Sequence, residues 1–367
     1  EVGGAVLFVT NEDGSQPRRI WRTNHAAPQG AELIWSAAGS EFPLAWAKAG
    51  SALLILLKID DTQRDLWVSD GTAAGTRLLK AGFVDAVYFD AVAPEAAYFH
   101  SAHPDVSGDH YWRADANGAT PLDTQGVISA NGYLAAAIYQ GDLWVTDGAR
   151  VVRVPAGSTT GEVVLNGGWD YELDRLYAAG DTLYLVDRHM VAMEPIQDVL
   201  WRYKATTKVL ERTGKYGAID TLAAMGDSLY FTDTYGEPAQ QATRLLRLLQ
   251  TAKTPSVVSV MATGGDNGAR NMVAAGSLVY LHVWRNGFDW DLWASDGTPD
   301  GTRMLTPIWR RSDGSSKFIN CPCLTIANDR LYFDKKVGRT DVELWTVHFV
   351  DTANDTDFVY LPEVQTP

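Results

Sequence analysis

The chain has 367 residues, of which 46% are hydrophobic and 21% charged, a composition typical of a globular protein with a large core. Its net charge of −14 argues against a nucleic-acid partner, because binding a phosphate backbone requires a basic face. The longest aliphatic run, Leu53 to Leu57, is far shorter than the roughly 18 residues of a membrane-spanning helix, so we expect no transmembrane segment.

The ends of the chain and its cysteines say little about the fold. Because the sequence begins at Glu1 rather than Met, we expect a mature form without its signal peptide. The two cysteines, Cys321 and Cys323, are separated by one proline and cannot connect distant parts of the fold. A strained local disulfide, two free thiols and half of a metal site are all compatible with that spacing.

An internal repeat is the strongest signal in the sequence. The segment Asp65 to Leu79 returns almost unchanged at Asp291 to Leu305, and a shortened copy occupies Asp142 to Gly148. In each copy a Leu-Trp pair begins a β-prone run, Asp-Gly forms a tight turn, and an Arg-Leu-Leu-like run begins the returning strand. A motif repeated within one chain serves the fold of each unit, so Ser-Asp-Gly-Thr is interpreted as a structural turn and not as a catalytic site.

A second element precedes each Trp strand, and it fixes the period of the repeat. It consists of a short apolar strand, a Gly-Asp-like turn and a Leu-Tyr-Phe strand, as around Gly180, Gly226 and Asn328. Eight copies, counted from Leu7 to Tyr332, recur about every 46 residues. Four consecutive antiparallel strands at this period predict an all-β fold, a β-propeller of four-stranded antiparallel blades that forms a single domain over residues 1–367.

The sequence is compatible with more than one number of blades and more than one closure of the ring. Eight blades are favoured, with seven as the alternative if two weak units share a blade. The first unit begins at the strand Ala5 to Thr10 with only four residues before it, so blade one either lacks its inner strand or is completed by a terminal segment.

The repeated motif resembles a known bacterial family. Leu66 to Thr72 with Gly75-Thr76, and the copy at residues 292–302, are similar to the ELWxSDGTxxGT repeat of large envelope and extracellular proteins predicted to be β-propellers. The resemblance implies a secreted or cell-envelope location, in the periplasm or at the cell surface, and repeat-built binding surfaces, but no catalytic residues. The chain departs from the pattern where Leu246 replaces the Trp of unit six and where unit five lacks the Asp-Gly turn.

Irregular segments are expected at the end of the blades opposite the repeated turns, and binding sites on repeat scaffolds usually lie in such segments. The hairpin from Val283 to Trp290 combines three aromatic residues and a cation, which suits stacking on sugar rings or docking a protein. The competing interpretation is that these aromatics only cover the edge of their own blade. The predicted binding residues are Trp284, Arg285, Phe288, Trp290 and, from a neighbouring segment, Tyr235.

Two clusters have the composition of weak metal sites. His100, His103 and His110 lie in one predicted hairpin, although their spacing matches no strong zinc pattern. Asp351, Asp355 and Asp357, with Asn354, could supply oxygen ligands to a structural metal such as calcium, although the EF-hand spacing is missing. A solvated polar hairpin in the first case and a plain turn in the second are the favoured alternatives.

The sequence therefore predicts a non-enzymatic binding or assembly propeller whose irregular loop face takes a protein or a glycan. The alternative is a propeller hydrolase or lyase, with or without a metal, that has an acidic site in the central funnel. The carboxylates near inner strands are Asp85, Asp90, Asp174 and Asp220. None of the established nucleophile, zinc-protease or phosphate-binding motifs occurs, so no catalytic residue is assigned.

Overall fold

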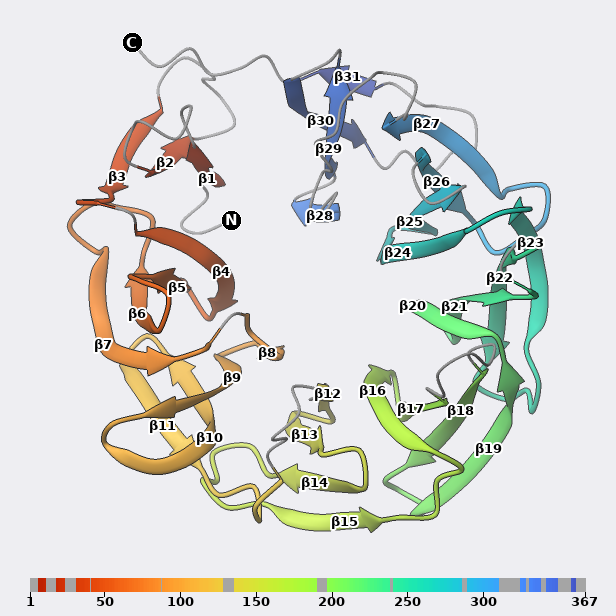
Figure 1. Cartoon of the computed structure of the whole chain (residues 1–367), viewed down its shortest axis with the longest axis horizontal. Helices are drawn as coiled ribbons and strands as arrows, with labels where there is room; N and C mark the ends of the chain where they lie inside the picture. Colours follow the sequence, from red (N-terminus) through yellow and green to blue (C-terminus); the bar gives the residue numbers. More distant parts are fainter. Residues whose placement is uncertain are drawn as a thin grey trace. The chain divides into compact units, whose positions relative to one another are not determined.

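The computed structural model describes residues 6–10, 18–23, 31–39, 41–86, 88–127, 135–189, 197–237, 240–285, 289–309, 324–327, 330–337, 341–348 and 358–360. Every regular element in these ranges is a β-strand, and the strands of each sheet follow one another in chain order (Figure 1). In the described ranges no helix is long and apolar enough to cross a membrane. The predicted all-β fold is confirmed.

The described strands form seven sheets, and the second has eight strands because β7 (Arg77–Val84) pairs with β9 (Ala96–His103) through Val84 and Ala102. Dividing that sheet at this single pair gives eight groups in chain order, which we call blades one to eight. Blade one has three described strands: β1 (Val6–Thr10), β2 (Arg19–Thr23) and β3 (Glu32–Ser36). The next three blades are β4 (Phe42–Ala49), β5 (Ala52–Lys58), β6 (Gln63–Ser69) and β7 (Arg77–Val84); β8 (Ala91–Ala93), β9 (Ala96–His103), β10 (Val106–Asp115) and β11 (Gly118–Leu122); and β12 (Ala135–Tyr139), β13 (Asp142–Thr146), β14 (Arg150–Val154) and β15 (Glu162–Asn166).

Blades five to eight have the same four-stranded antiparallel order. Their strands are β16 (Glu172–Ala179), β17 (Thr182–His189), β18 (Gln197–Lys204) and β19 (Val209–Tyr216); β20 (Ala218–Met225), β21 (Ser228–Tyr235), β22 (Ala242–Leu249) and β23 (Ser256–Thr263); β24 (Gly268–Ala275), β25 (Leu278–Arg285), β26 (Asp289–Ser295) and β27 (Arg303–Trp309); and β28 (Leu324–Ala327), β29 (Arg330–Val337), β30 (Asp341–His348) and β31 (Phe358–Tyr360).

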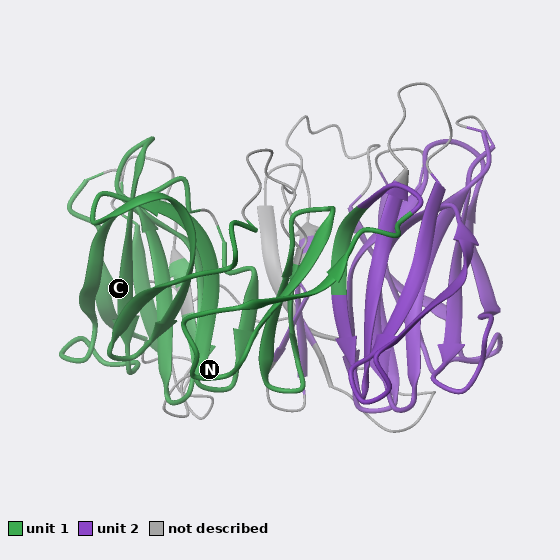
Figure 2. Ribbon diagram, turned by 90° about the horizontal axis from the view of Figure 1, so that it is seen from below, with its two compact units in different colours: residues 1–169, 173–176, 366–367 green, residues 170–172, 177–365 purple. Residues whose placement is uncertain are grey.

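The chain divides into two compact units (Figure 2). Unit 1 contains Glu1–Trp169, Leu173–Leu176 and Thr366–Pro367, and unit 2 contains Asp170–Glu172 and Tyr177–Gln365. Both units contain blades of the same kind. That they form a single domain, as the sequence predicts, stays a prediction.

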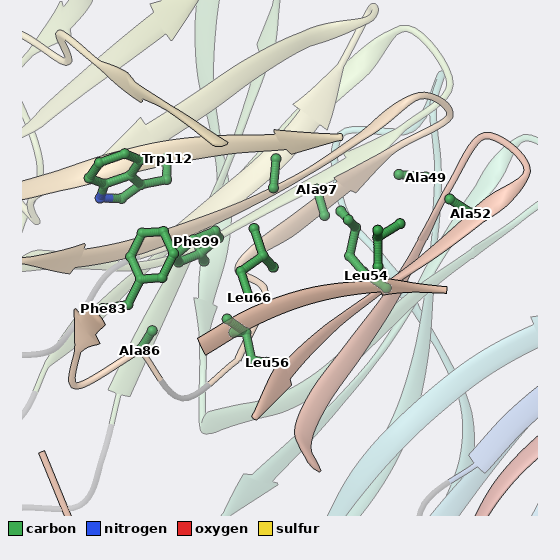
Figure 3. Packing of buried hydrophobic residues seen from close by; sticks show 13 residues of the cluster. Ala49, Ala52, Leu54, Leu56, Leu66, Phe83, Ala86, Ala97, Phe99 and Trp112 are labelled. Atoms are coloured by element: carbon green, nitrogen blue, oxygen red, sulfur yellow. The ribbon is translucent and has the colours of Figure 1, made fainter. Parts of the chain in front are cut away.

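Within each unit, apolar side chains from adjacent blades pack into shared cores. Leu54, Leu56 and Leu66 of blade two share one cluster with Phe99 and Trp112 of blade three (Figure 3). The ring of Phe83 meets those of Phe99 and Trp112 edge-on, with ring centres 5.0 and 5.1 Å apart. Because strand side chains alternate between two faces, each blade can use one face for the preceding neighbour and the other for the next.

The Trp of the repeat faces the preceding blade. Trp67 packs against the cluster that contains Ile20 and Ile34 of blade one, and Trp293 packs against the cluster that contains Tyr230 of blade six. Leu246, which replaces the Trp in blade six, is buried in the cluster shared with blade five. The position is therefore a packing position whether Trp or Leu occupies it.

A β-bulge lies beside this Trp on the fourth strand of the blade. Leu66 pairs with Lys80 and Trp67 with Leu78, so the fourth strand carries one extra residue, Leu79. Leu78 remains exposed, whereas Leu79 packs against the core shared with blade three. Blade seven has the same shift, and its extra residue is Leu305. The bulge explains why two apolar residues follow Arg in the motif.

The Ser-Asp-Gly-Thr turn is held by its own polar side chains. One oxygen of Asp70 accepts hydrogen bonds from the N–H (2.8 Å) and the hydroxyl (2.7 Å) of Thr72, and the second copy repeats both distances at Asp296 and Thr298. These bonds, the hydroxyl first, hold the pKa of Asp70 below its usual value. The carboxylate lies so close to Gly75 that a Cβ there would overlap it, and Gly301 stands in the same relation to Asp296. The interpretation of this motif as a structural turn fits the contacts.

We expect Trp67→Ala and Trp293→Ala each to destabilise the fold by about 3 kcal/mol, because each removes a large ring from between two blades. Equilibrium denaturation of both variants measures this cost. Leu246→Ala serves as the control for the same position without an indole. Wild-type midpoints in both Trp variants would contradict the proposed packing role.

We expect Gly75→Ala to lower the unfolding midpoint, because the new Cβ must displace the Asp70 carboxylate and break its bonds to Thr72. In the double variant with Asp70→Ala the clash is gone, so the two changes together should cost less than their sum. Thermal unfolding of the four-member cycle, repeated at Gly301 and Asp296, tests this twice in one chain. Additive effects at both sites would exclude the steric explanation.

Candidate functional site

The predicted aromatic hairpin joins β25 and β26 in blade seven. Its described residues belong to these two strands and not to a loop. Trp284 and Trp290 occupy directly opposite positions on the two strands, as do Arg285 and Asp289. The two indole rings lie 5.1 Å apart at an interplanar angle of 39°. Phe288, the third predicted aromatic, lies outside the described residues. The strands therefore hold both Trp side chains in a fixed relation to each other.

Packing within blade seven covers part of this aromatic pair. Gly268 on β24 pairs with Trp284, and the indole lies so close that no side chain larger than hydrogen fits at position 268. Trp290 packs against the core shared with blade eight. Both rings are half-buried. The rings cover part of their own blade, as the packing interpretation states. They also stay partly exposed, as the binding interpretation requires.

Two arginines accompany the aromatic pair. The guanidinium of Arg270, an exposed residue of β24, lies 5.3 Å from the centre of a Trp284 ring, within cation–π range. The guanidinium of Arg285 lies 2.8 Å from the carboxylate of Asp291, whose side chain is fully buried. Arg285 is held by its ion pair with Asp291. Arg270 lies against the indole of Trp284 and remains exposed to solvent.

Tyr235 lies at the end of β21 in blade six, and 40% of it is exposed. Arg244 stacks 4.0 Å above its ring and donates to the buried Asp233 through Nε (2.9 Å) and a terminal nitrogen (2.5 Å). This pairing is a second arginine–aromatic element with the same composition as the one in blade seven.

Hydrogen bonds connect the Tyr235 end of blade six to the Trp284 end of blade seven. The hydroxyl of Thr234 donates to Asp220 (2.8 Å), which also accepts from the N–H of Ala269 (3.4 Å), the neighbour of Gly268. The side-chain amide of Asn267 donates to the carbonyl oxygens of Gln241 and Gly264, both at 2.9 Å. Four of the five predicted binding residues therefore lie at the same end of two adjoining blades.

The three histidines do not converge on one point. His100 and His103 are three residues apart on β9, so they point to opposite faces of the strand. His103 bonds the carbonyl oxygen of Ala81 (2.9 Å) and contacts Trp112, whereas His100 bonds Asp90 (2.9 Å) and contacts Tyr111. His110 donates to the carbonyl oxygen of Ser107. In the part of the chain that the structure describes, no three His, Cys, Asp or Glu residues could hold one metal ion.

The other predicted clusters separate as follows. Asp351, Asp355 and Asp357, with Cys321 and Cys323, lie outside the described residues, so their metal and thiol assignments stay predictions. The four carboxylates of the enzyme alternative belong to different local settings: Asp85 is exposed, Asp90 bonds His100, Asp174 pairs with Arg175, and Asp220 connects blades six and seven.

The sequence analysis did not predict that three buried carboxylates, at the hairpin end of their blades, accept hydrogen bonds from the backbone. Asp65 and Asp142, which begin the Asp-Leu-Trp motif, accept the backbone N–H groups of Gly82 (3.1 Å) and Ala156 (2.7 Å). Asp187 accepts the N–H groups of Asp170 (2.7 Å) and Tyr171 (2.9 Å). In the sequence, Asp precedes the Leu-Trp pair at positions 65, 142 and 291, and this recurrence was the available signal for the backbone role of Asp65 and Asp142.

The comparisons with known proteins support the fold and no more. No protein-family model and no curated protein matches the chain. Solved structures that it resembles include one from a study of two prolyl endopeptidases (TM-score 0.55, 11% identity, 95% of this chain and 54% of that chain) and the tricorn protease (TM-score 0.52, 10% identity, 100% and 43%). A third is the β-propeller domain of the trilobed protease from Pyrococcus furiosus (TM-score 0.51, 12% identity, 89% and 99%).

The chain therefore spans about half the length of the first two proteins and nearly all of the third. Identities this low carry the fold and not the function. Together with the four-stranded blades, the likeness shows that the chain is an all-β protein with the β-propeller fold.

We expect Asp187→Asn to change how stability depends on pH. Burial first raises the pKa of Asp187, and the nearby charge of Asp170 adds to this, against the lowering effect of N–H groups from Asp170, Trp201 and Tyr171. A raised pKa in the folded state means that the contribution of Asp187 is complete below its unfolded pKa and is lost as pH rises through the folded value.

The wild type should accordingly lose stability relative to the Asn variant as pH rises from strongly acidic toward neutral. Unfolding free energies measured across that range test this, with the exposed Asp266→Asn as the control for net charge. A difference between wild type and Asp187→Asn that does not vary with pH would contradict the raised pKa.

Proposed function

We propose that this chain is a non-enzymatic binding or assembly propeller of the bacterial cell envelope or extracellular space, and that it takes a protein or a glycan at the hairpin end of blades six and seven. The observation that carries the proposal is the pair of half-buried indoles, Trp284 and Trp290, with the exposed Arg270 lying over one of them. Aromatic residues and arginines in this combination are the usual anchors of binding interfaces.

The charge of the chain supports the placement of the site. The protein carries a net charge of −14, yet Arg244, Arg270 and Arg285 all occur at this end of two adjoining blades. Asp233 and Asp291 neutralise two of them, which leaves Arg270 as the cation best placed to meet a carboxylate of a partner. A partner surface with acidic groups and an apolar patch would complement this end.

The opposite end of blade seven serves the fold. β26 begins at Asp289 beside the aromatic hairpin and ends at Ser295, where the Asp296–Gly301 turn satisfies its own hydrogen bonds. Because blade two has the same turn with the same contacts, these residues support blade geometry wherever they occur. This division of roles favours binding at the end where the blades differ.

The glycan branch is tested by co-sedimentation with purified peptidoglycan and by a glycan array. We expect Trp284→Ala and Arg270→Ala each to weaken binding by roughly 2 kcal/mol, the loss typical of an anchor residue. Thr72→Ala, at the turn end of blade two, should leave binding unchanged. Equal affinities of wild type and Trp284→Ala for every bound glycan would remove the hairpin from the site.

The protein branch is tested by placing a photo-crosslinking amino acid at position 284 or at position 72 in the native host. A discrete adduct from position 284 and none from position 72 is the expected result. Adducts from both positions, or from position 72 alone, would contradict the assignment of the hairpin end as the binding surface.

A further inference from the structure

A second cluster of polar and aromatic side chains lies in unit 1 and has no role in the proposed site. Asp90, which precedes the first strand of blade three, has a side chain only 2% exposed and bonds Nδ1 of His100 at 2.9 Å. Since an ionised carboxylate can only accept, the hydrogen is on Nδ1 of the imidazole. Asp90 thus orients the His100 ring and directs Nε2 to the side away from the carboxylate.

Aromatic rings border this Asp–His pair on two sides. Tyr88, which is 47% exposed, meets the imidazole of His100 at 6.1 Å and an angle of 74°. Tyr111, which pairs with His100 across the sheet, is completely buried and also lies 6.1 Å from that ring. The side chain of His100 is 23% exposed, so the exposed tyrosine and the imidazole form a corner that solvent reaches.

Two buried polar atoms behind this corner are unsatisfied. The Oδ1 atom of Asp90 and the hydroxyl of Tyr111 have no hydrogen-bond partner among the residues that the structure describes. The pKa of Tyr111 lies well above its ordinary value, first because of burial and then because of the charge of Asp90, which indicates that the two groups are near each other. Buried polar groups without partners cost free energy, and functional sites are where such a cost is commonly retained.

The chemistry of the cluster selects among ligand classes. Anions are disfavoured by Asp90 and by Asp109, whose charge also acts on His100. Burial lowers the pKa of His100, but the hydrogen bond and charge of Asp90 together with Asp109 raise it above the ordinary value, so a cation would compete with the imidazolium. A hydroxyl can donate to a carboxylate and accept from an imidazole N–H or a phenol, and a sugar ring can stack on Tyr88.

We propose that Tyr88, Asp90, His100 and Tyr111 form a saccharide subsite of blade three, in which Tyr88 supplies the stacking surface and the Asp90–His100 pair, backed by the Tyr111 hydroxyl, binds sugar hydroxyls. The subsite is separate from the hairpin of blades six and seven and does not depend on the function proposed for it.

The test measures binding of maltotetraose, cellotetraose and chitotetraose to the whole chain by saturation-transfer NMR and titration. We expect at least one tetrasaccharide to bind with a dissociation constant in the millimolar range or tighter. Tyr88→Ala should weaken that binding about tenfold, and because this side chain is exposed the variant should fold. Tyr111→Phe should weaken binding as well without lowering stability, since it deletes an unsatisfied buried hydroxyl.

Controls separate this subsite from the hairpin site. Val209→Ala removes an exposed apolar side chain of blade five, and Thr72→Ala changes the turn end of blade two; both should bind the tetrasaccharide as the wild type does. Tyr88→Ala should lower the affinity by the same factor in the wild type and in Trp284→Ala, because the two sites are independent. Failure of all three sugars to bind, or wild-type affinity in both Tyr88→Ala and Tyr111→Phe, overturns the proposal. Binding of spermidine or inorganic phosphate that Tyr88→Ala abolishes, in place of sugar binding, overturns the ligand class.

Discussion

The structure depends on each blade being apolar on both faces. A four-stranded sheet whose two faces are apolar is not stable alone in water, and burying its side chains requires a neighbour on each side. The shared clusters show how this is met inside the units: residues of blades two and three form one core, those of blades five and six another, and those of blades seven and eight a third. The Trp of the motif, turned toward the preceding blade, adds a large ring to such a contact.

The polar residues of the blades follow from the same constraint. When both faces are apolar, backbone groups at the two ends of a blade still need hydrogen-bond partners, and short acidic side chains supply them. At the turn end Asp70 bonds the residues of its own turn, and at the other end Asp65 and Asp187 accept N–H groups of chain segments that enter or leave the sheet. Much of the acidity of the repeat motif thus serves the fold.

The sequence predicted the repeat and the strand order because these features depend on local patterns that recur, but not which neighbouring blade the Trp faces. The bulge that turns Leu79 inward was not predicted, since alternation alone assigns Leu78 and Leu79 to opposite faces without saying where the register shifts. The histidines lie in one hairpin, β9–β10, as predicted, but strand geometry puts His100 and His103 on opposite faces, which the spacing alone did not show.

The four described candidate binding residues lie at one end of blades six and seven, and their binding role stays a prediction; how their rings pack was not predictable from the sequence. Nothing in the sequence of the hairpin shows that Trp284 lies against Gly268, because that residue is sixteen positions earlier on another strand. The Asp90–His100 pair was missed for the same reason. Its members are ten residues apart and meet only because the first two strands of blade three are antiparallel.

The close approach of Trp284 to Gly268 also bears on how such a surface could change over evolution. The glycine allows the six-membered ring of the indole to approach the backbone closely, so the neighbouring strand helps to set the shape of the hairpin surface. A methyl group at position 268 would lift the ring away from the sheet and expose more of it without altering either Trp. In related chains, the residue opposite an aromatic would therefore be as informative about what the surface can bind as the aromatic itself.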